Sequence, residues 1–319
     1  MSKENVTIIG CGVSGLTSGI RLLEEGYGVR IVAASLPPEA TSNVAAAYWY
    51  PYKVSPQDKV LGWASYSYKK FLELSELPEA GVSVFELLKI FDRNMEEPFW
   101  KGAVRSFRKA LSNDLPQGYV SGFIAEVPRI ETPVYMRYLL SRFTESDGEI
   151  KELGTGLSDI RELSGESDLI INCTDLGAGK LCGDENVFPI KGQLVRTTNP
   201  GLSRAINDEL GPLAVSYIVP RRHDCILGGT TDKNNWSLDV DSIISQEILR
   251  KCRILEPKLK KAEVLEYKVG LRPGRTEVRL ELEHIPGLGP VIHNYGHGGG
   301  GFTLSWGCAE DVIRIAESM

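Results

Sequence analysis

Two arginines and a tyrosine in the second half of the chain have side chains that can bind a carboxylate. Arg272 and Arg275 stand in the segment GLRPGR (residues 270–275), beside turn-forming residues that follow an expected strand over residues 264–269. A guanidinium presents a planar fork of donors that matches a carboxylate. Strand alternation can turn the ring of Tyr217 inward. The residues alone leave a second possibility open for each: a surface cation for the arginines and a core aromatic for Tyr217.

A phosphate-binding turn is predicted near the N-terminus. An apolar run at residues 6–9 precedes GCGVSG at residues 10–15, then come apolar residues with helical spacing and a β-branched run at residues 29–32. In such a unit the first glycine permits a tight turn, the second lets a pyrophosphate approach the backbone, and the third lets the helix pack on the strand. The expected cofactor contacts here are Gly10, Gly12, Val13, Ser14 and Gly15.

The second strand of this unit ends without the acidic residue that usually holds a ribose. Residues 33–35 read Ala-Ala-Ser, so no carboxylate is available there. Ser35 can still bond a ribose hydroxyl. No arginine stands there either, which disfavours a 2′-phosphate and therefore NADP.

A glycine-dense segment lies close to the C-terminus. Six glycines fall within residues 296–307, and a helix is expected from about Thr303. Glycine adds unfolded-state entropy and contributes no packing, so this density indicates backbone that passes close to a flat or anionic group. His293 and His297 are four residues apart, but a glycine-rich loop has no helical face on which two imidazoles converge, and we expect no metal site.

Residues 39–52 change from small and hydroxyl-bearing residues to four aromatic residues around Pro51. The segment is either a loop that leads into an aromatic core patch or a cofactor-binding segment. In the second case its Thr and Ser donors would bond phosphate and its alanines would lie against a planar ring.

The remaining patterns predict an α/β fold. Residues 58–112 have helical patterning, a helix begins near residue 133, and a short buried strand covers residues 169–174. Strand signals then recur at residues 194–197, 215–219 and 225–227. The charge-dense stretch at residues 250–261 is expected to be a solvated helix face.

Composition and charge exclude several classes of protein. The 319 residues include 36 Lys plus Arg and 42 Asp plus Glu, a formal net charge of −6 that opposes nucleic-acid binding. No apolar run reaches the 18 residues of a membrane span, so we expect a soluble, cytoplasmic protein. Six scattered cysteines lack metal-site spacing and are expected to be buried thiols.

Seven ordered segments together resemble the FAD-dependent D-amino-acid oxidases. They are GCGVSG at 10–15, residues 44–52, Asn172-Cys173-Thr174, residues 189–193, residues 217–220, residues 270–273 and HNYGHGG at 293–299. The resemblance implies a Rossmann-like FAD-binding domain and a second, mainly antiparallel-sheet substrate domain, each discontinuous in sequence. It places residues 1–52, 145–190 and 270–319 in the FAD-binding domain, and residues 53–144 and 191–269 in the substrate domain.

The resemblance also implies roles for individual residues. Arg272 and Tyr217 would hold the substrate carboxylate, the Gly299 carbonyl would receive the substrate amine, and Tyr50 would line the side-chain pocket. The Cα hydrogen of one enantiomer would then face the flavin, and dioxygen would reoxidise the cofactor to give hydrogen peroxide. The further cofactor contacts implied are Ser35, Thr41, Ser42, Ala45, Ala46, Gly298, Gly299, Gly301, Phe302 and Thr303.

The chain departs from the family pattern in three places. Asp175 replaces a glycine that commonly follows Asn-Cys-Thr, which leaves the local backbone geometry in question, and Gly300 stands where an aromatic residue is often found. The stretch between Arg196 and Tyr217 lacks the tyrosine-bearing lid of animal members. A short-loop, microbial-type member is therefore the closer likeness.

Several functions stay open at this point. Tyr48, Trp49 and Tyr50 favour a neutral or apolar D-amino acid, whereas Arg221 and Arg222 leave D-aspartate as an alternative. A glycine- or sarcosine-type amine oxidase, a flavin dehydrogenase with a carrier acceptor, and a flavin-binding protein without turnover are the other candidates. The partners expected are a D-amino acid and dioxygen, with no nucleic acid and no membrane; a homodimer is the one assembly considered.

Overall fold

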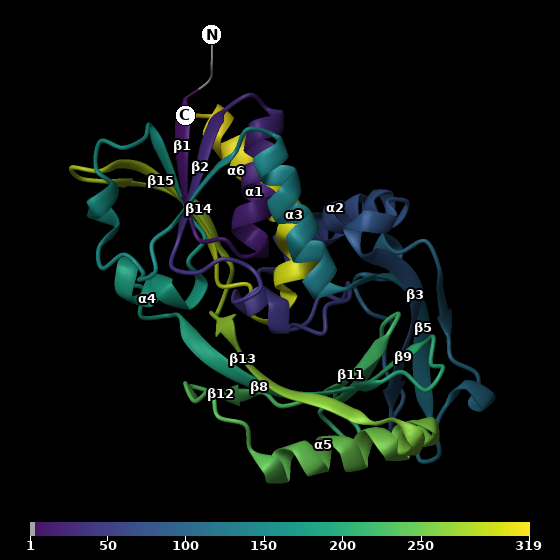
Figure 1. Cartoon of the computed structure of the whole chain (residues 1–319). Helices are drawn as coiled ribbons and strands as arrows, with labels where there is room; N and C mark the ends of the chain where they lie inside the picture. Colours follow the sequence, from purple (N-terminus) through teal and green to yellow (C-terminus); the bar gives the residue numbers. More distant parts are fainter. Residues whose placement is uncertain (1–3) are drawn as a thin grey trace.

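The computed structural model describes residues 4–319, and its strands form two sheets that lie one above the other (Figure 1). The first sheet is parallel apart from one edge strand. In order across the sheet its strands are β14 (Arg279–Ile285), β15 (Gly289–Tyr295), β7 (Leu169–Asn172), β1 (Asn5–Ile9), β2 (Gly28–Ala33) and β6 (Glu149–Glu152). Only β14 runs antiparallel to its neighbour. The central strands β1 and β7 are buried almost throughout, as is typical of a parallel sheet with both faces covered.

Helices cover one face of this sheet. Helix α1 (Val13–Glu24) packs against α6 (Gly301–Glu317) and α3 (Thr132–Glu145), and α2 (Gln57–Ser75) packs against α6. Polar contacts also join these helices; for example, Trp306 Nε1 donates to the Tyr135 hydroxyl at 2.8 Å and Trp63 Nε1 donates to Asp311 at 2.6 Å. The other face is covered by the segment that contains α4 (Ala178–Leu181), where Ile9, Val32 and Leu181 share an apolar cluster.

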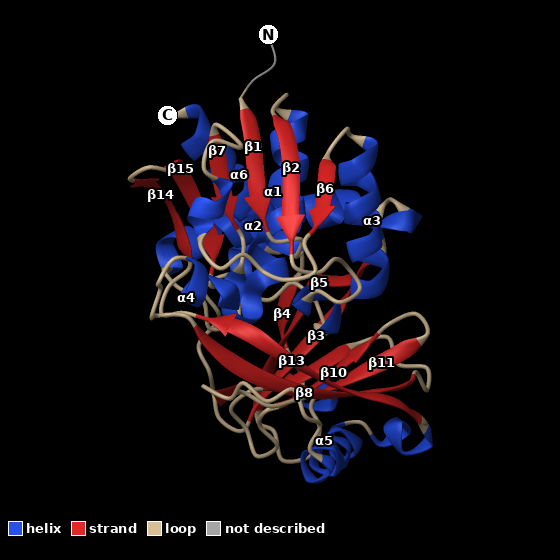
Figure 2. Cartoon of the chain, turned by 60° about the vertical axis from the view of Figure 1, so that its left-hand side comes forward, coloured by secondary structure: helices blue, strands red, loops and turns tan. Residues whose placement is uncertain are grey.

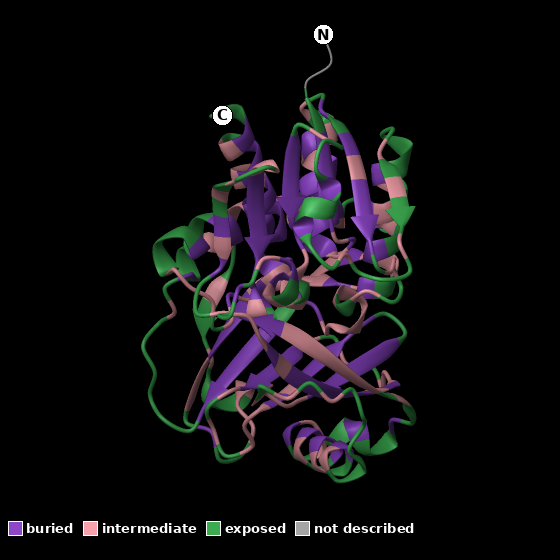
Figure 3. Cartoon of the chain, turned by 90° about the vertical axis from the view of Figure 1, so that its left-hand side faces the viewer, coloured by how far each residue is buried: buried purple, intermediate pink, exposed green. Residues whose placement is uncertain are grey.

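The second sheet is mainly antiparallel and lies below the first in Figure 2. Its order is β12 (Asp232–Lys233), β8 (Phe188–Thr198), β11 (Asp224–Gly228), β10 (Ser216–Pro220), β9 (Ala205–Asp208), β3 (Val82–Phe91), β5 (Ser121–Ile130) and β4 (Phe107–Lys109), with β13 (Val264–Gly274) also paired to β8. The pair β3–β9 is parallel. Helix α5 (Ser242–Leu255) covers one face with a buried apolar stripe, and its outer side is exposed in Figure 3. The opposite face turns toward the first sheet.

The predicted α/β class and the N-terminal unit agree with the structure. β1, α1 and β2 follow the expected order, and Gly26 ends the helix with a φ of +85°. The buried strand expected at 169–174 is β7, and the helix expected near residue 133 is α3. Helix α6 begins two residues before the predicted start at Thr303.

Two local predictions were wrong. Residues 58–112 were expected to be helical, but only α2 is a long helix there and the segment continues into β3 and β4. Residues 82–91 contain a nearly continuous apolar run that pairs on both sides, and such a run has no periodicity that separates strand from helix. Residues 270–275 were expected to form a turn, but β13 continues through Gly274 because it stays paired with β8.

The two sheets divide the chain differently from the expected domain ranges. Helices α2 and α3 lie within residues 53–144 yet pack on the helices of the first sheet, and β13 carries residues 270–274 into the second sheet. Leu194 and Val219 of the second sheet belong to the same apolar cluster as Ile8 of the first. Within residues 4–319 no helix combines the length and apolarity needed to cross a bilayer.

Candidate active site

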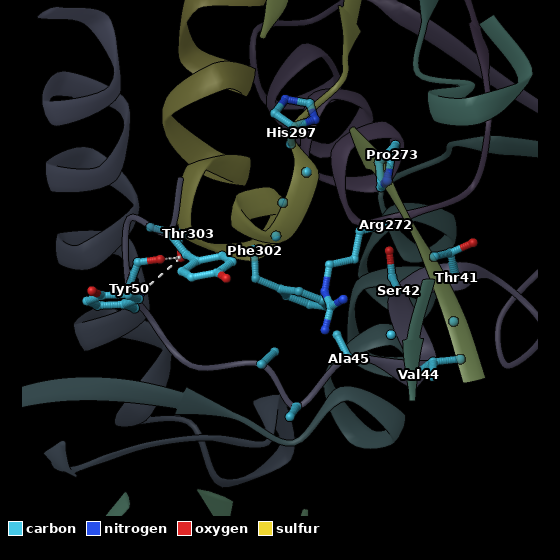
Figure 4. A pocket seen from close by; sticks show the side chains of 18 of the residues that line it. Thr41, Ser42, Val44, Ala45, Tyr50, Arg272, Pro273, His297, Phe302 and Thr303 are labelled. Carbon is cyan, nitrogen blue, oxygen red and sulfur yellow. Dashed lines mark hydrogen bonds between the residues drawn. The ribbon is translucent and has the colours of Figure 1, made fainter. Parts of the chain in front are cut away.

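A large cavity lies between the two sheets, at the carboxyl ends of β1 and β7. It encloses about 1280 Å³ of space between the protein atoms, partly open to solvent. A second hollow of about 1070 Å³ adjoins it at the ends of β1 and β2. Thr41, Ser42, Asp175, Leu271 and Pro273 line both, so the two hollows form one extended cleft. Figure 4 shows the first hollow. Ligands of open α/β sheets bind at this edge.

The predicted glycine turn stands at the junction of the two hollows. Gly10 has a φ of +109°, and a Cβ there would lie 2.5 Å from the Cys173 carbonyl oxygen. A Cβ on Gly15 would lie 2.0 Å from the Gly10 carbonyl oxygen, which is the close approach that the motif requires. Gly12 precedes helix α1, and the Val13 amide donates to Ser42 Oγ at 3.1 Å. The N-terminus of α1 therefore faces the cleft, where its dipole favours an anion.

Most of the predicted cofactor residues line this cleft. Gly10, Gly12 and Ser35 line the second hollow, Thr41 and Ser42 line both, and the first is lined by Val13, Ser14, Ala45, Ala46, Gly298, Gly299, Gly301, Phe302 and Thr303. Gly15 lines neither, because its part is to let α1 pack on β1. Apart from Asp175, no Asp or Glu of the described chain lines the second hollow, which matches the missing ribose carboxylate.

Arg272, Tyr217 and Gly299 come together in the first hollow. Arg272 crosses over the backbone of Gly192, where a Cβ would lie 2.3 Å from Nη1, and Nη1 donates to the Thr230 carbonyl at 3.0 Å. The ring of Tyr217 lies over Gly228 in the same way, where a Cβ would lie only 2.0 Å from Cζ. Two glycines on neighbouring strands thus make room for the two side chains. On the other side, a Cβ on Gly299 would lie 3.8 Å from Arg272 Cδ.

The electrostatics of Tyr217 agree with this arrangement. Burial raises the pKa of the Tyr217 hydroxyl, and the neighbouring Arg272 guanidinium opposes that rise. The hydroxyl therefore stays protonated at neutral pH and can donate. A guanidinium and a phenol that point into the same space make a site for one carboxylate.

The second arginine of the segment has a different position. Arg275 Nε pairs with Asp184 at 2.9 Å and Nη1 donates to the Glu277 carbonyl. Its side chain also fills the space beside Gly296. Arg275 does not line the cleft, so of the two guanidiniums only Arg272 remains for a ligand.

An aromatic wall closes the first hollow. Tyr48, Tyr50 and Tyr52 line it, with centroid distances of 6.3 Å between successive rings. Thr303 holds this wall to α6: its hydroxyl accepts from the Tyr50 amide and donates to the Tyr50 carbonyl, both at 3.1 Å (Figure 4). Both hydrogen-bonding directions of the Thr303 hydroxyl are thus used by the protein.

The loop after β7 is fixed by Asn172. Its Oδ1 accepts from the Thr174 amide and hydroxyl, so its Nδ2 must point toward His293 Nδ1 at 3.2 Å. That Nδ1 accepts, and the imidazole proton lies on Nε2, which is 2.9 Å from Glu283. Burial, with Arg279 adding to it, lowers the pKa of His293. His293 is thus a neutral core residue that positions the loop.

Asp175 adopts the left-handed backbone that its glycine counterpart would favour. Its φ is +50°, a conformation that Asp tolerates better than most residues. Its Oδ1 is buried without a hydrogen-bond partner, 3.9 Å from His297 Nδ1. Gly300 is the second position at which the chain departs from the pattern of the family that it resembles. A Cβ there would lie 2.8 Å from Val54 Cγ1, so Val54 occupies the space that a larger residue would need.

Sequence reasoning missed a polar group in the first hollow, beside the tyrosine wall. Asn207 and Glu209 line the hollow beside the tyrosines, and Lys89 lies behind them. Lys89 interrupts the apolar run of β3, and this was the one available signal. The hydroxyl of Tyr52 is also buried here and has no partner.

The comparisons with known proteins agree with this geometry. A family model described as "FAD dependent oxidoreductase" matches residues 5–315. The chain is 45% identical over 312 residues to a D-amino-acid oxidase of Rubrobacter xylanophilus, which covers 97% of this chain and 94% of the relative. It is 34% identical to the human D-aspartate oxidase, over 99% of this chain and 95% of the relative.

Among solved structures, a glycine oxidase from Geobacillus kaustophilus superposes with a TM-score of 0.83 at 20% identity, covering all of this chain and 95% of that one. This likeness concerns the fold. The family model, in contrast, matches nearly the whole chain, and the Rubrobacter relative is 45% identical to it. The chain therefore belongs to the FAD-dependent oxidoreductase family.

Proposed function

We propose that this chain oxidises D-amino acids with neutral side chains to 2-oxo acids, with release of ammonia and hydrogen peroxide. The observation that carries the proposal is the convergence of Arg272, Tyr217 and the Gly299 backbone in the hollow that adjoins the glycine turn. This group offers two donors for a carboxylate and a backbone segment for an amine. The named oxidase relatives support the same chemistry.

The residues of the cleft fit an extended FAD. The N-terminus of α1, with Ser42 and Thr41, would hold the pyrophosphate, and the second hollow would take the adenosine beside Ser35. The backbone of residues 298–303 and the small side chains of Ala45 and Ala46 would lie against the ring. The buried, unpaired Tyr52 hydroxyl and Asp175 Oδ1 indicate a polar ligand, because buried polar atoms normally have a partner. We propose that the first sheet with α1, α2, α3 and α6 is the FAD-binding part.

The protein's own contribution is positioning. Arg272 and Tyr217 would bind the carboxylate through charge-assisted bonds, the Gly299 carbonyl would accept from the amine, and the tyrosine wall would exclude water. Contacts to the carboxylate, the amine and the side chain fix three of the four substituents of the α-carbon, so only one enantiomer would direct its Cα hydrogen away from the second sheet. Orientation of this kind can supply roughly 7–11 kcal/mol at its upper limit. No side chain is required to remove the α-proton.

The overall reaction balances with dioxygen and water as co-reactants. FAD held by these residues would supply the two-electron oxidation, with dioxygen as the final electron acceptor. The substrate amine becomes an imine, and water hydrolyses the C=N bond to a 2-oxo acid and ammonia. One D-amino acid, one dioxygen and one water thus give one 2-oxo acid, one ammonia and one hydrogen peroxide.

The basis for D-aspartate as substrate weakens in the structure. Arg221 is buried and forms a two-point pair with Asp224, with Nε–Oδ1 at 2.6 Å and Nη2–Oδ2 at 2.7 Å. Arg222 is exposed, and neither arginine lines the cleft. Tyrosine rings line the part of the hollow where the substrate side chain would lie, and such rings favour a neutral side chain.

A peroxide assay tests the proposal. Purified, FAD-loaded protein is mixed with D-alanine or L-alanine in two separate assays, one in air alone and one with an artificial electron carrier. We expect peroxide from D-alanine and none from L-alanine. Turnover with the carrier but no peroxide would identify a dehydrogenase, and no turnover with any D-amino acid would reject the proposal.

A further inference from the structure

Beside the tyrosine wall of the first hollow lies a buried ion pair that the carboxylate-binding group does not use. Lys89 on β3 is 2% exposed and stands directly opposite Asn207 on β9. Its Nζ donates to Asn207 Oδ1 at 2.8 Å, forms a short ion pair with Glu209 Oε2, and lies 4.7 Å from the centre of the Tyr50 ring. The three donors of this ammonium are therefore taken up by the protein.

Glu209, in contrast, keeps an acceptor for a ligand. Its side chain is 12% exposed and lines the hollow. Oε2 accepts from Lys89 and from the Tyr50 hydroxyl at 3.3 Å, whereas the only cation near Oε1 within residues 4–319 is Lys53, whose Nζ is 3.8 Å away. Lys53 is 59% exposed, so its ammonium can leave into solvent. A substrate ammonium could therefore bind Glu209 Oε1, because no fixed cation of the protein occupies that position.

The charges that line the hollow favour one class of side chain. In the described chain the lining contains one cation of the Lys or Arg type, Arg272, which the α-carboxylate would occupy. Glu209 is the carboxylate beside the tyrosines. A substrate side chain that ends in a carboxylate would lie beside the Glu209 carboxylate, and like charges at close range repel.

We infer that Glu209 selects among D-amino acids by their side-chain ends, accepting ammonium and other hydrogen-bond donors and rejecting carboxylates. The inference rests on the proposed D-amino-acid oxidation and extends its substrate class from neutral side chains to side chains that end in an ammonium group. Glu209 acts at the side-chain end of the substrate and takes no part in the oxidation step.

Paired substrates test this inference on the wild-type enzyme. D-lysine and D-norleucine differ by the terminal ammonium, and D-glutamine and D-glutamate differ by the terminal charge. We expect a higher kcat/KM for D-lysine than for D-norleucine, and at least a tenfold higher kcat/KM for D-glutamine than for D-glutamate. D-ornithine and D-2,3-diaminopropionate measure how far the side chain must reach.

The variant Glu209→Gln keeps the size of the side chain and removes its charge. The ratio of kcat/KM for D-lysine over D-norleucine should fall at least tenfold, about 1.4 kcal/mol. Because Lys89 would lose its counter-charge, the double variant Lys89→Met/Glu209→Gln is measured too. Glu263→Gln, an exposed carboxylate outside the cleft, is the matched control.

The outcomes separate the two levels of the proposal. Equal kcat/KM for both pairs in the wild type, or unchanged ratios in a variant that retains its flavin absorbance, would overturn the role of Glu209 while leaving D-amino-acid oxidation intact. Preference for D-glutamate would also overturn it. Absence of peroxide from every D-amino acid would reject the proposed function itself.

Discussion

The two ends of the cleft are formed by different segments of the chain and by different kinds of residue. The nucleotide end is made mostly of backbone and small residues from residues 9–42 and from the loop after β7, with further residues from segments 153–157 and 271–273. The substrate end is made of large polar side chains from β9, β10 and β13 and from the tyrosines at 48, 50 and 52. The nucleotide end depends on close contact between backbone segments, and the substrate end depends on the pairing of strands that are distant in sequence.

This difference predicts how each end fails. Enlarging a residue at the nucleotide end should abolish cofactor binding, because the neighbouring atoms are backbone and cannot move aside. Removing a side chain at the substrate end should weaken substrate binding and leave the cofactor in place. The predictions below test that separation, beginning with the largest effect.

Arg272→Leu removes the guanidinium that would bind the α-carboxylate. We expect KM for D-alanine to rise about a hundredfold or more, since loss of one partner of a buried charge pair costs about 2–5 kcal/mol. Steady-state kinetics measures KM, and the flavin absorbance of the purified variant should equal that of the wild type. Arg222→Leu is the matched control, an exposed arginine outside the cleft. An unchanged KM would remove Arg272 from this role.

Gly10→Ala places a methyl group 2.5 Å from the Cys173 carbonyl oxygen, at a φ of +109°. Strain and clash together should cost about 2–4 kcal/mol and cause the protein to be purified with little FAD. Gly26→Ala is the control, since Gly26 also has a positive φ but open space around it. Cofactor content from the visible spectrum checks both variants. Full FAD occupancy in Gly10→Ala would contradict the assignment of the turn.

Tyr217→Phe keeps the ring over Gly228 and removes one donor. The expected rise in KM for D-alanine is about tenfold, because a hydrogen bond to a charged group contributes about 1.5–3 kcal/mol and Arg272 remains. Flavin content should not change. Tyr66→Phe, whose hydroxyl bonds Glu310 on α6, serves as a comparison outside the cleft. A loss of flavin in Tyr217→Phe would mean that the two ends of the cleft are not separable.

His293 makes the nucleotide end sensitive to acid. Its pKa in the folded state is lowered from 6.5 by burial, so below about pH 6.5 the unfolded chain binds a proton that the folded chain does not. The free energy of unfolding should therefore fall as pH decreases from about 6.5, by up to about 1.4 kcal/mol per pH unit from this group. Denaturant titrations from pH 7.5 to 5.0 measure the slope.

The variant His293→Gln should have a shallower slope than the wild type over this range, and His284→Gln, at an exposed position, should not differ from it. Identical slopes for the wild type and His293→Gln would show that the imidazole does not titrate as proposed.

The nucleotide end could be predicted from the sequence because its signals are local. The spacing of the glycines, the helical period after them and the β-branched run all lie within about thirty residues, and the structure contains each element in that order. Gly270 to Arg275 shows the limit of local reasoning. Its glycine and proline suggested a turn, but pairing with β8 keeps the segment in a strand.

The polar group at the substrate end could not be predicted in this way. Lys89 and Asn207 are neighbours only because β3 and β9 pair in parallel, and the two residues are 118 apart in sequence. A single lysine in an apolar strand indicates that the lysine has a buried partner, but the sequence does not identify that partner. The distinct fates of Arg272 and Arg275 depend on the same tertiary pairing.

The central claim is that Arg272 positions a D-amino acid beside FAD in this cleft, and anaerobic reduction of the bound flavin tests it most directly. D-alanine added without oxygen should bleach the flavin band of the wild type, and L-alanine should not. Arg272→Leu, with equal flavin content, should need at least a hundredfold more D-alanine. Equal bleaching by both enantiomers, or the same concentration dependence in Arg272→Leu and the wild type, would contradict the account.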